Sequence, residues 1–390
     1  MKTRFSITFL VLLTLQSVMA GDDFQTPGSK HSNSKMQLGR KLFFDANLSS
    51  PPGQSCGSCH ASETFFTDSD KAIPTSKGVF QERRGNRNAP TVMYAAFSPA
   101  FHFDRTEGLY VGGQFLDGRA ATLSDQAKGP FLNPLEMANP DKATVVDKVR
   151  KSEYRPLFER VYGKGSLDDT NKAFKRIADA IAAFERSPVF AQFTSKYDFY
   201  LVGKARLSRQ EKRGRKVFED PEKGNCAACH PDRPGADGAP PLFTDFTYDN
   251  LGVPKNPENP FYTLQPEFNP KGLDFVDKGL GSIVHDRLQN GKFKVPTLRN
   301  IAKTAPYMHN GYFKTLRGVV DFYSSRDIKP SCTSPFTGEA LAIRSACWPV
   351  PEVGENVNHA ELGMLGLTDQ EVDDLVAFLR TLTDGYRPSY

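Results

Sequence analysis

One five-residue motif occurs twice and constrains this chain more than any other feature. The motif is C-x-x-C-H, and its copies are formed by Cys56, Cys59 and His60 and by Cys226, Cys229 and His230. This spacing is the attachment signature of c-type haem. The two thiols bond the vinyl groups of one haem, and the adjacent histidine meets the iron as an axial ligand. The sequence therefore predicts two covalently bound haem c groups.

Two other chemistries use paired cysteines. A four-cysteine zinc site joins two C-x-x-C pairs that usually lie about 15–20 residues apart, whereas these two pairs lie in opposite halves of the chain. A thioredoxin-type redox pair occurs once, at the start of a helix that follows a strand, and neither pair here follows a strand-like run. Haem attachment is the interpretation that fits both copies.

The other two cysteines, Cys332 and Cys347, form an even remainder. In an exported protein such a remainder predicts a disulfide, and two buried free thiols are the alternative. The bridge would close a short loop, which the chain-entropy account values at about 3 kcal/mol. The sole tryptophan, Trp348, follows Cys347. It either packs on this disulfide or serves as a redox or docking residue on a partner-facing surface.

The N-terminus resembles a secretory signal. Lys2 and Arg4 precede an apolar run over 9–15, and residues 18–20 suit signal peptidase. A membrane anchor needs about 18 or more apolar residues, so this run is too short, and no later segment could span a bilayer. We predict a signal peptide over 1–20 and export to the periplasm, with the outer surface as an alternative location.

Composition excludes two broad classes of protein. At 38% hydrophobic residues the chain is too apolar for a disordered protein, and its 390 residues correspond to about two domains. The net charge of +5 falls to +3 without residues 1–20, and no run of Lys and Arg reaches the length of a nucleic-acid patch. The propionates of two haems would bring the holoprotein near neutrality, so we expect no nucleic-acid partner.

The two haem motifs lie inside a weak internal repeat. The segment GRKLFFD at 39–45 precedes the first motif, and GRKVFED at 214–220 precedes the second. Upstream, Ser34 with Gln37 and Ser208 with Glu211 resemble the capping boxes that begin helices. Each half therefore begins with a helix and a turn that lead into a haem motif, which is the outline of a cytochrome c unit. We predict haem domains over 21–203 and 204–390.

Helical spacing recurs along the chain, while strand patterns are scarce. We expect helices over 143–149, 154–162, 174–184 and 367–382. Thr368 and Glu371 cap the last of these helices, which could pack back on the first domain. Long Gly- and Pro-rich loops that wrap a cofactor are expected over 62–90, 231–292 and 324–366. The predicted fold class is mainly α, with two cytochrome c-like haem domains, long loops and few short strands.

Further tracts extend the comparison beyond the haem motifs. They are RNAPT at 87–91, DGRA at 117–120, QAKGP at 126–130, NPLEM at 133–137, NLGVP at 250–254, FKVPTLRN at 293–300 and TAPYMHNG at 304–311. In order and spacing, the chain resembles the bacterial dihaem cytochrome c peroxidase/MauG family from about 39 to 382.

The resemblance implies roles around the first haem. His60 is the proximal ligand of the peroxide-reacting haem, and Glu136 matches the distal acid–base group. Peroxide must lose a proton from one oxygen and gain one on the other, which a carboxylate near the iron can arrange. Gln126 and Pro130 match other positions of the distal pocket.

Many peroxidases of this family close the distal face with a second histidine downstream of the motif. No histidine lies between His60 and His102 here, and Ser76 and Phe80 occupy that region. We therefore expect a five-coordinate first haem. His102 is the one rival ligand, and we interpret it as an ordinary loop or surface histidine.

For the second haem, the resemblance makes His230 the proximal ligand and places the opposite ligand at Tyr323, counted from His309. The peroxidases have Met at this position, whereas the MauG branch has Tyr. A phenolate favours oxidised iron, so Tyr323 suits a haem that holds an oxidising equivalent. A core-packing role for Tyr323, and Met308 as a competing ligand, are the alternatives.

The resemblance also implies Ca²⁺ between the domains, with Asn88, Thr304 and Pro306 matching its ligands, mainly through carbonyl oxygens and with water completing the shell.

One position departs from the family: Leu116 replaces the Trp that usually lies between the haems. An aliphatic side chain cannot carry a hole, so Phe115 and Tyr94 become candidates for the relay.

Together these features predict an exported dihaem oxidoreductase that uses H₂O₂. Two fates of its oxidising power are open. In a cytochrome c peroxidase, electrons from a small donor protein, a c-type cytochrome or cupredoxin, reduce the oxidised haems. In MauG, the oxidised enzyme instead oxidises residues of a partner protein. The open first haem and Tyr323 favour the second fate, and Leu116 weakens it. The alternative from another class is a non-catalytic dihaem electron-transfer cytochrome, which would need neither Glu136 nor an open site.

Overall fold

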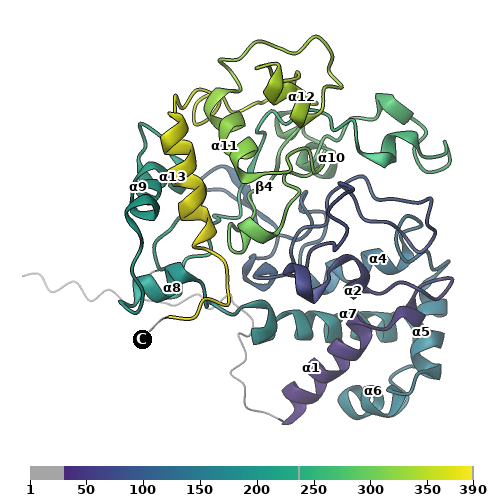
Figure 1. Cartoon of the computed structure of the whole chain (residues 1–390). Coiled ribbons are helices and arrows are strands. Elements are labelled where there is room, and N and C mark those ends of the chain that lie inside the picture. The colour runs from purple at the N-terminus through teal and green to yellow at the C-terminus, as the bar shows by residue number, and fades with distance from the viewer. Residues whose placement is uncertain (1–29, 236–237, 389–390) are drawn as a thin grey trace, which may run out of the picture.

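The computed structural model describes residues 30–235 and 238–388. The predicted signal peptide, 1–20, lies outside these residues. The described chain is mainly helical, as predicted, with two short two-stranded sheets. The helices, drawn in Figure 1, are α1 (Lys30–Phe43), α2 (Cys56–Cys59), α3 (Leu123–Gln126), α4 (Gly129–Leu132), α5 (Lys142–Lys151), α6 (Arg155–Tyr162), α7 (Thr170–Glu185), α8 (Lys196–Leu201), α9 (Arg209–Glu219), α10 (Leu280–Val284), α11 (Leu316–Ser325), α12 (Glu339–Arg344) and α13 (Asp369–Arg380).

The strands are few and short. β1 (His102–Asp104) pairs antiparallel with β2 (Leu109–Val111), and β3 (Tyr248–Asp249) pairs antiparallel with β4 (Phe293–Lys294). The pairing of β3 with β4 joins two of the long connections in the second half. No helix within the described residues is both long enough and apolar enough to cross a bilayer.

Two apolar cores organise the described chain. In the first, α1 packs on α7, and Leu38, Phe43, Ile177 and Phe184 are buried between the helices that Figure 1 places at one end of the molecule. In the second, α9 packs on α13, with α11 alongside. Its buried side chains include Phe218, Phe322, Leu375 and Phe378.

The internal repeat is explained by two close helix crossings. Gly39 of α1 lies against α7, where a Cβ would stand 1.8 Å from the carbonyl oxygen of Ala180. Gly214 of α9 lies against α13, where a Cβ would stand 1.8 Å from the carbonyl oxygen of Asp374. Any side chain at either glycine would push two helix backbones apart. The repeated glycine therefore sets the same crossing in both halves.

Helix starts follow the sequence at two of the three predicted caps. Ser208 with Glu211 and Thr368 with Glu371 form reciprocal capping boxes at α9 and α13. The predicted start at Ser34 is wrong, because α1 extends upstream to at least Lys30 and places Ser34 inside the helix.

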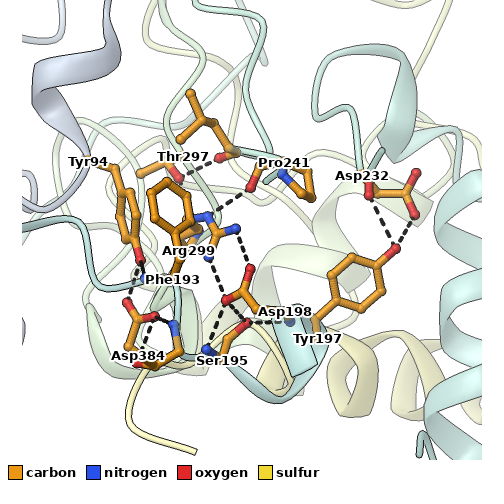
Figure 2. A network of polar contacts seen from close by, with 12 residues as sticks. Tyr94, Phe193, Ser195, Tyr197, Asp198, Asp232, Pro241, Thr297, Arg299 and Asp384 are labelled. Carbon is orange, nitrogen blue, oxygen red and sulfur yellow. Dashed lines mark hydrogen bonds and ion pairs between the residues drawn. The ribbon is translucent and has the colours of Figure 1, made fainter. Parts of the chain in front are cut away.

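The segment after the last helix joins the two halves. α13 packs on α9 and α11. Beyond this helix, Asp384 accepts a hydrogen bond from Tyr94 of the first half (2.8 Å). Figure 2 shows the polar network at this junction. At its centre the buried Arg299 donates to both carboxylate oxygens of Asp198 (3.0 and 2.8 Å) and to Pro241 O. The network joins three parts of the chain: residues 193–198, which form the linker between the halves, Arg299 of the second half, and the C-terminal segment with Asp384.

Cys332 and Cys347 form a disulfide, as predicted. Trp348, next in the chain, is 2% exposed and packs edge-on against Phe313 and Phe322, and its indole N–H donates to Ser325 Oγ (3.1 Å). Of the two interpretations of Trp348, the structure shows a packing residue of the second core and not a surface residue.

Candidate active site

Both haem motifs adopt the same kind of turn. The first motif forms α2, and the second forms the 3-10 turn Cys226–Ala228. In each copy the backbone N–H of the histidine donates to the carbonyl of the first cysteine, at 2.9 Å for both His60 and His230. Each turn therefore presents two thiols and one imidazole together, which is the donor set that haem attachment needs.

A backbone carbonyl orients the ring of each motif histidine. His60 Nδ1 lies 3.0 Å from Phe66 O, and His230 Nδ1 lies 2.7 Å from Phe243 O. Because a carbonyl only accepts, Nδ1 carries the proton and Nε2 is left as the ligand atom. Burial lowers the pKa of both imidazoles, which favours the neutral form that binds a metal.

The four motif cysteines are half-buried and lie outside the disulfide. Burial raises the pKa of Cys59, Cys226 and Cys229 to about 12, and it raises the pKa of Cys56 as well. The two pairs also pack against different cores, Cys56 on the first and Cys226 on the second, so they do not form one four-cysteine site.

A cavity of about 320 Å³ adjoins the second motif. Cys226, Cys229, His230 and Tyr323 line it, together with residues of the first half. Its size falls within the range of pockets that hold cofactor-sized molecules. These residues fit a haem held by two thiols and one histidine.

The structure places Tyr323 on α11, on the wall of the cavity that His230 also lines. Burial raises the pKa of its phenol, and the charge of Arg326 opposes that rise. Met308, the competing candidate, lines the same cavity. Tyr323 thus reaches the haem site from an element remote in sequence from the motif.

Glu136 lies near the first motif. Burial is the main reason why the pKa values of Cys56 and Cys59 are raised, and the negative charge of Glu136 adds to the rise. Its backbone is fixed on two sides, because Val79 N–H donates to Glu136 O (2.8 Å) and Glu136 N–H donates to Asn133 O (3.0 Å). The loop downstream of the first motif therefore positions this carboxyl.

Glu136 also borders an open cavity of about 620 Å³, with Arg119, Asp125 and Asn133 as the other polar lining residues. Arg119 stacks on Phe115, with Cζ 3.5 Å from the ring centroid, and Nη1 donates to an oxygen of Asp117 (2.8 Å). Burial raises the pKa of the Glu136 carboxyl, while the positive charge of Arg119 and a hydrogen bond from Asn133 lower it. The pocket thus holds a carboxyl with a raised pKa beside a guanidinium that stacks on an aromatic ring.

Gln126 and Pro130 flank this cavity but are not among its described lining residues. Gln126 ends α3, and Pro130 lies in α4, where its carbonyl accepts from Met137 N–H (3.2 Å).

No described lining residue of the cavity beside Glu136 is a histidine. His102 is exposed in β1, with Nδ1 2.8 Å from Ala100 O. Ser76, downstream of the first motif, lies near Cys59, where its hydroxyl opposes the rise in the pKa of that thiol.

Asn88, Thr304 and Pro306, the residues matched to a calcium site, all line the 320 Å³ cavity. The side-chain N–H of Asn88 donates to Pro74 O (3.1 Å), which leaves the amide oxygen as the atom that could bind a cation. Leu116 lines the same cavity, and its carbonyl accepts from the backbone N–H of Lys294 (2.8 Å).

Residues 33–206 match the di-haem cytochrome c peroxidase family. The chain is 43% identical to the methylamine utilization protein MauG of Paracoccus denitrificans, over 89% of this chain and 88% of that protein. It is 32% identical to the cytochrome c551 peroxidase of Pseudomonas aeruginosa, over 75% of this chain and 72% of that protein. The chain belongs to the dihaem cytochrome c peroxidase/MauG family.

A solved member of the dihaem peroxidase/MauG family shares the fold. The structure of the diheme peroxidase BthA from Burkholderia thailandensis superposes with a TM-score of 0.73 at 32% identity, and covers 90% of this chain and 86% of that one. As a member of this family, the protein is a dihaem c-type oxidoreductase of the peroxidase type, with two haem c groups.

Sequence reasoning did not single out Arg119, which lines the cavity that Glu136 borders. The residue lies in one of the matching tracts, 117–120, but nothing local in that tract indicates that its guanidinium stacks on Phe115 beside Glu136. The signal that could have found it is the stabilisation that a nearby cation gives to a carboxylate whose pKa burial raises.

Proposed function

We propose that the protein reacts with H₂O₂ at the first haem and uses the oxidising equivalents in the MauG manner, on residues of a partner protein. The observation that carries this proposal is the position of Tyr323, which lines the cavity of the second motif with His230. A phenolate ligand stabilises oxidised iron, whereas the thioether of the peroxidases stabilises reduced iron. The 43% identity to MauG supports the same choice.

Haem c, once attached, supplies an iron centre that binds and reduces peroxide. The chain supplies the proton chemistry. Glu136 takes the proton from one oxygen of H₂O₂ and gives it to the other, so that water can leave. Burial raises the pKa of this carboxyl, which brings its basic and acidic forms closer in energy at neutral pH. The positive charge of Arg119 limits that rise.

His60 and His230 act as proximal ligands in this proposal. Their Nδ1 protons, held by Phe66 O and Phe243 O, fix the ring planes and make Nε2 a better donor. We propose that the first haem, once attached, would have His60 as its one protein ligand, and that Glu136, with Gln126 and Pro130, would serve the reaction with peroxide. We further propose that the haem domains divide at 203/204, and that the protein is exported to the periplasm after removal of 1–20.

The second candidate is a cytochrome c peroxidase, in which a c-type cytochrome or cupredoxin refills both haems. One observation favours it: Leu116 stands where the family has a relay Trp, which weakens long-range charge sharing.

Turnover measurements separate the MauG-type function from the cytochrome c peroxidase function. The holoprotein receives H₂O₂ with reduced cytochrome c, and separately with co-expressed neighbouring proteins whose masses are followed. A MauG-type enzyme changes the mass of a partner and oxidises cytochrome c slowly. Rapid cytochrome c oxidation without any mass change contradicts this proposal.

The role of Glu136 is tested in the same holoprotein. Glu136→Gln should slow the reaction with H₂O₂ by about 10²–10⁴, the usual loss when an acid–base group is removed. Glu107→Gln, in the exposed turn between β1 and β2, is the matched control and should react at the wild-type rate. Equal rates for both variants would remove Glu136 from the mechanism.

Calcium is proposed to bind between the halves at Asn88, Thr304 and Pro306, which line one cavity wall. Holoprotein treated with EGTA and then titrated calorimetrically with CaCl₂ should bind one ion. Asn88→Ala should weaken binding by at least about tenfold, since one oxygen ligand is lost, whereas Asn171→Ala on α7 should not. Absence of binding heat in the wild type would reject the site.

A further inference from the structure

Tyr94 lies between the two haem sites. It belongs to the first core, against which Cys56 of the first motif packs. It also lines the cavity that contains Cys226, His230 and Tyr323 of the second site. Its side chain is 2% exposed. Its backbone adopts a left-handed conformation (φ 62°), which an aromatic residue rarely takes and which clusters at functional positions.

The hydroxyl of Tyr94 has a ready proton acceptor. Tyr94 Oη donates to Asp384 Oδ2 (2.8 Å) and accepts from the backbone N–H of Phe193 (2.9 Å), as Figure 2 shows. Burial raises the pKa of the phenol, with Asp384 among the charges that add to the rise. Tyr94 is therefore a neutral phenol at physiological pH, and loss of an electron must be accompanied by loss of its proton.

The surroundings favour that coupled loss over formation of a charged ring. The guanidinium of Arg299 lies 4.9 Å from the ring centroid of Tyr94, and a cation there opposes a second positive charge on the ring. A neutral radical carries no such penalty. Asp384 is held in place by Asn300 Nδ2 (2.9 Å) and Thr194 N–H (2.9 Å), so the acceptor oxygen is fixed before any electron moves.

Three other tyrosines, buried or half-buried, also donate to a carboxylate but lie elsewhere in the fold. Tyr154 donates to Asp45, Tyr162 to Asp179 and Tyr197 to Asp232. None of these three lines the cavity between the halves. Tyr248, by contrast, donates to the carbonyl of Gly112, which cannot take up a proton. Among the described tyrosines, Tyr94 combines a carboxylate partner with a place on the cavity wall.

We propose that Tyr94 is a redox-active tyrosine that replaces the relay lost at Leu116. One electron passes from the Tyr94 ring to the enzyme that H₂O₂ has oxidised, which cancels one of its two oxidising equivalents. The O–H bond of Tyr94 breaks, and the proton bonds to Asp384 Oδ2. A neutral tyrosyl radical and a neutral carboxylic acid result. One electron from the donor or partner protein then restores both groups. This inference rests on the proposed reaction with peroxide.

The test looks for the radical itself. Holoprotein grown with ring-deuterated tyrosine, and the same protein grown with ordinary tyrosine, are mixed with H₂O₂, frozen within milliseconds and examined by electron paramagnetic resonance. An organic radical signal that narrows on deuteration identifies a tyrosine. It should fall at least tenfold in Tyr94→Phe. It should persist in Tyr197→Phe, which removes a hydroxyl with the same kind of carboxylate partner in the same network (Figure 2).

Asp384→Asn provides a second variant, because it keeps a hydrogen-bond acceptor but removes the proton acceptor. The radical yield should fall in Asp384→Asn and return in Asp384→Glu. Yield and decay that match the wild type in both Tyr94→Phe and Asp384→Asn overturn the proposal, as does a wild-type signal that does not narrow. The haem absorption change in the same mixing experiment separates the two ideas: no change on adding H₂O₂ rejects the proposed function, whereas a change without a tyrosyl signal rejects only the role of Tyr94.

Discussion

Arg87 binds Asp277 across the two halves of the chain through two parallel hydrogen bonds, from Nε to Oδ2 and from Nη2 to Oδ1, each 2.7 Å long. The third arm of the guanidinium donates to Asp117 Oδ2 (2.6 Å). Both carboxylates are buried. Such a planar, bidentate pair fixes orientation as well as distance, and here it holds the RNAPT tract of the first half against the second.

The Arg87–Asp277 pair predicts that the free energy of unfolding falls in acid. Burial raises the pKa of Asp277, but the charge and hydrogen bonds of Arg87 outweigh it and bring the pKa to about 2. A carboxyl whose folded pKa is depressed stabilises the protein above its unfolded pKa and loses that effect as pH falls through the folded value. We expect a loss of about 2 kcal/mol between about pH 4 and pH 2. Urea unfolding followed by circular dichroism measures it, and Asp277→Asn should be less stable and flatter across this window. A wild-type curve as flat as that of the variant would contradict the assignment.

Arg119 should set the pH dependence of the peroxide reaction. Its positive charge lowers the pKa of Glu136, which burial otherwise raises. Arg119→Gln should therefore raise that pKa further. Because the carboxyl must be ionised to take a proton from peroxide, the acid limb of the rate profile should move to higher pH. Stopped-flow rates against pH give the shift. Arg105→Gln, exposed beside β1, is the control, and an unmoved limb in Arg119→Gln would rule out the coupling.

Tyr323 should control only one of the two haem spectra. The ferric holoprotein is expected to show one high-spin and one low-spin haem, and Tyr323→Phe or Tyr323→Met should alter the low-spin signal alone. Tyr307→Phe is the matched control, because Tyr307 lines the same cavity but donates to Ile301 O (3.0 Å). A low-spin spectrum that survives in Tyr323→Phe would exclude Tyr323 as the ligand and turn attention to Met308.

Removal of the disulfide should destabilise the second half of the chain. Cys332 and Cys347 are separated by 15 positions, and a loop of that size corresponds to about 3 kcal/mol in the chain-entropy account. The double variant Cys332→Ser/Cys347→Ser should unfold at lower guanidinium concentration, with reductant having no further effect on it. An unchanged midpoint would mean that the packing of Trp348 on Phe313 and Phe322 is sufficient for this loop.

Local features of the fold were predictable because their causes are local. The C-x-x-C-H spacing implies a single turn, and Ser208 and Thr368 each meet their capping partner three residues on. Ser34 has the same pattern and failed, since nothing within four residues reveals that a helix has already begun. The positions of Glu136 and Tyr323 were reached through family resemblance and not through spacing alone.

Contacts between distant segments were not predictable from the sequence. Arg299 finds Asp198 and Tyr94 finds Asp384 only after both halves have folded and the C-terminal segment has returned to the linker. Buried ion pairs of this kind have no periodic signature, and any of the chain's many acidic residues could have been the partner. The stacking of Arg119 on Phe115 escapes prediction for the same reason.

The two glycine crossings determine how each haem motif is held within its own half of the chain. At Gly39 and Gly214 one helix backbone rests directly on another, so neither contact depends on the rotamer of a side chain at the glycine. Each crossing lies on the helix that leads into a C-x-x-C-H turn. The approach of that helix to its partner is therefore set by backbone against backbone, and each C-x-x-C-H turn begins from a helix whose position side-chain changes elsewhere need not alter.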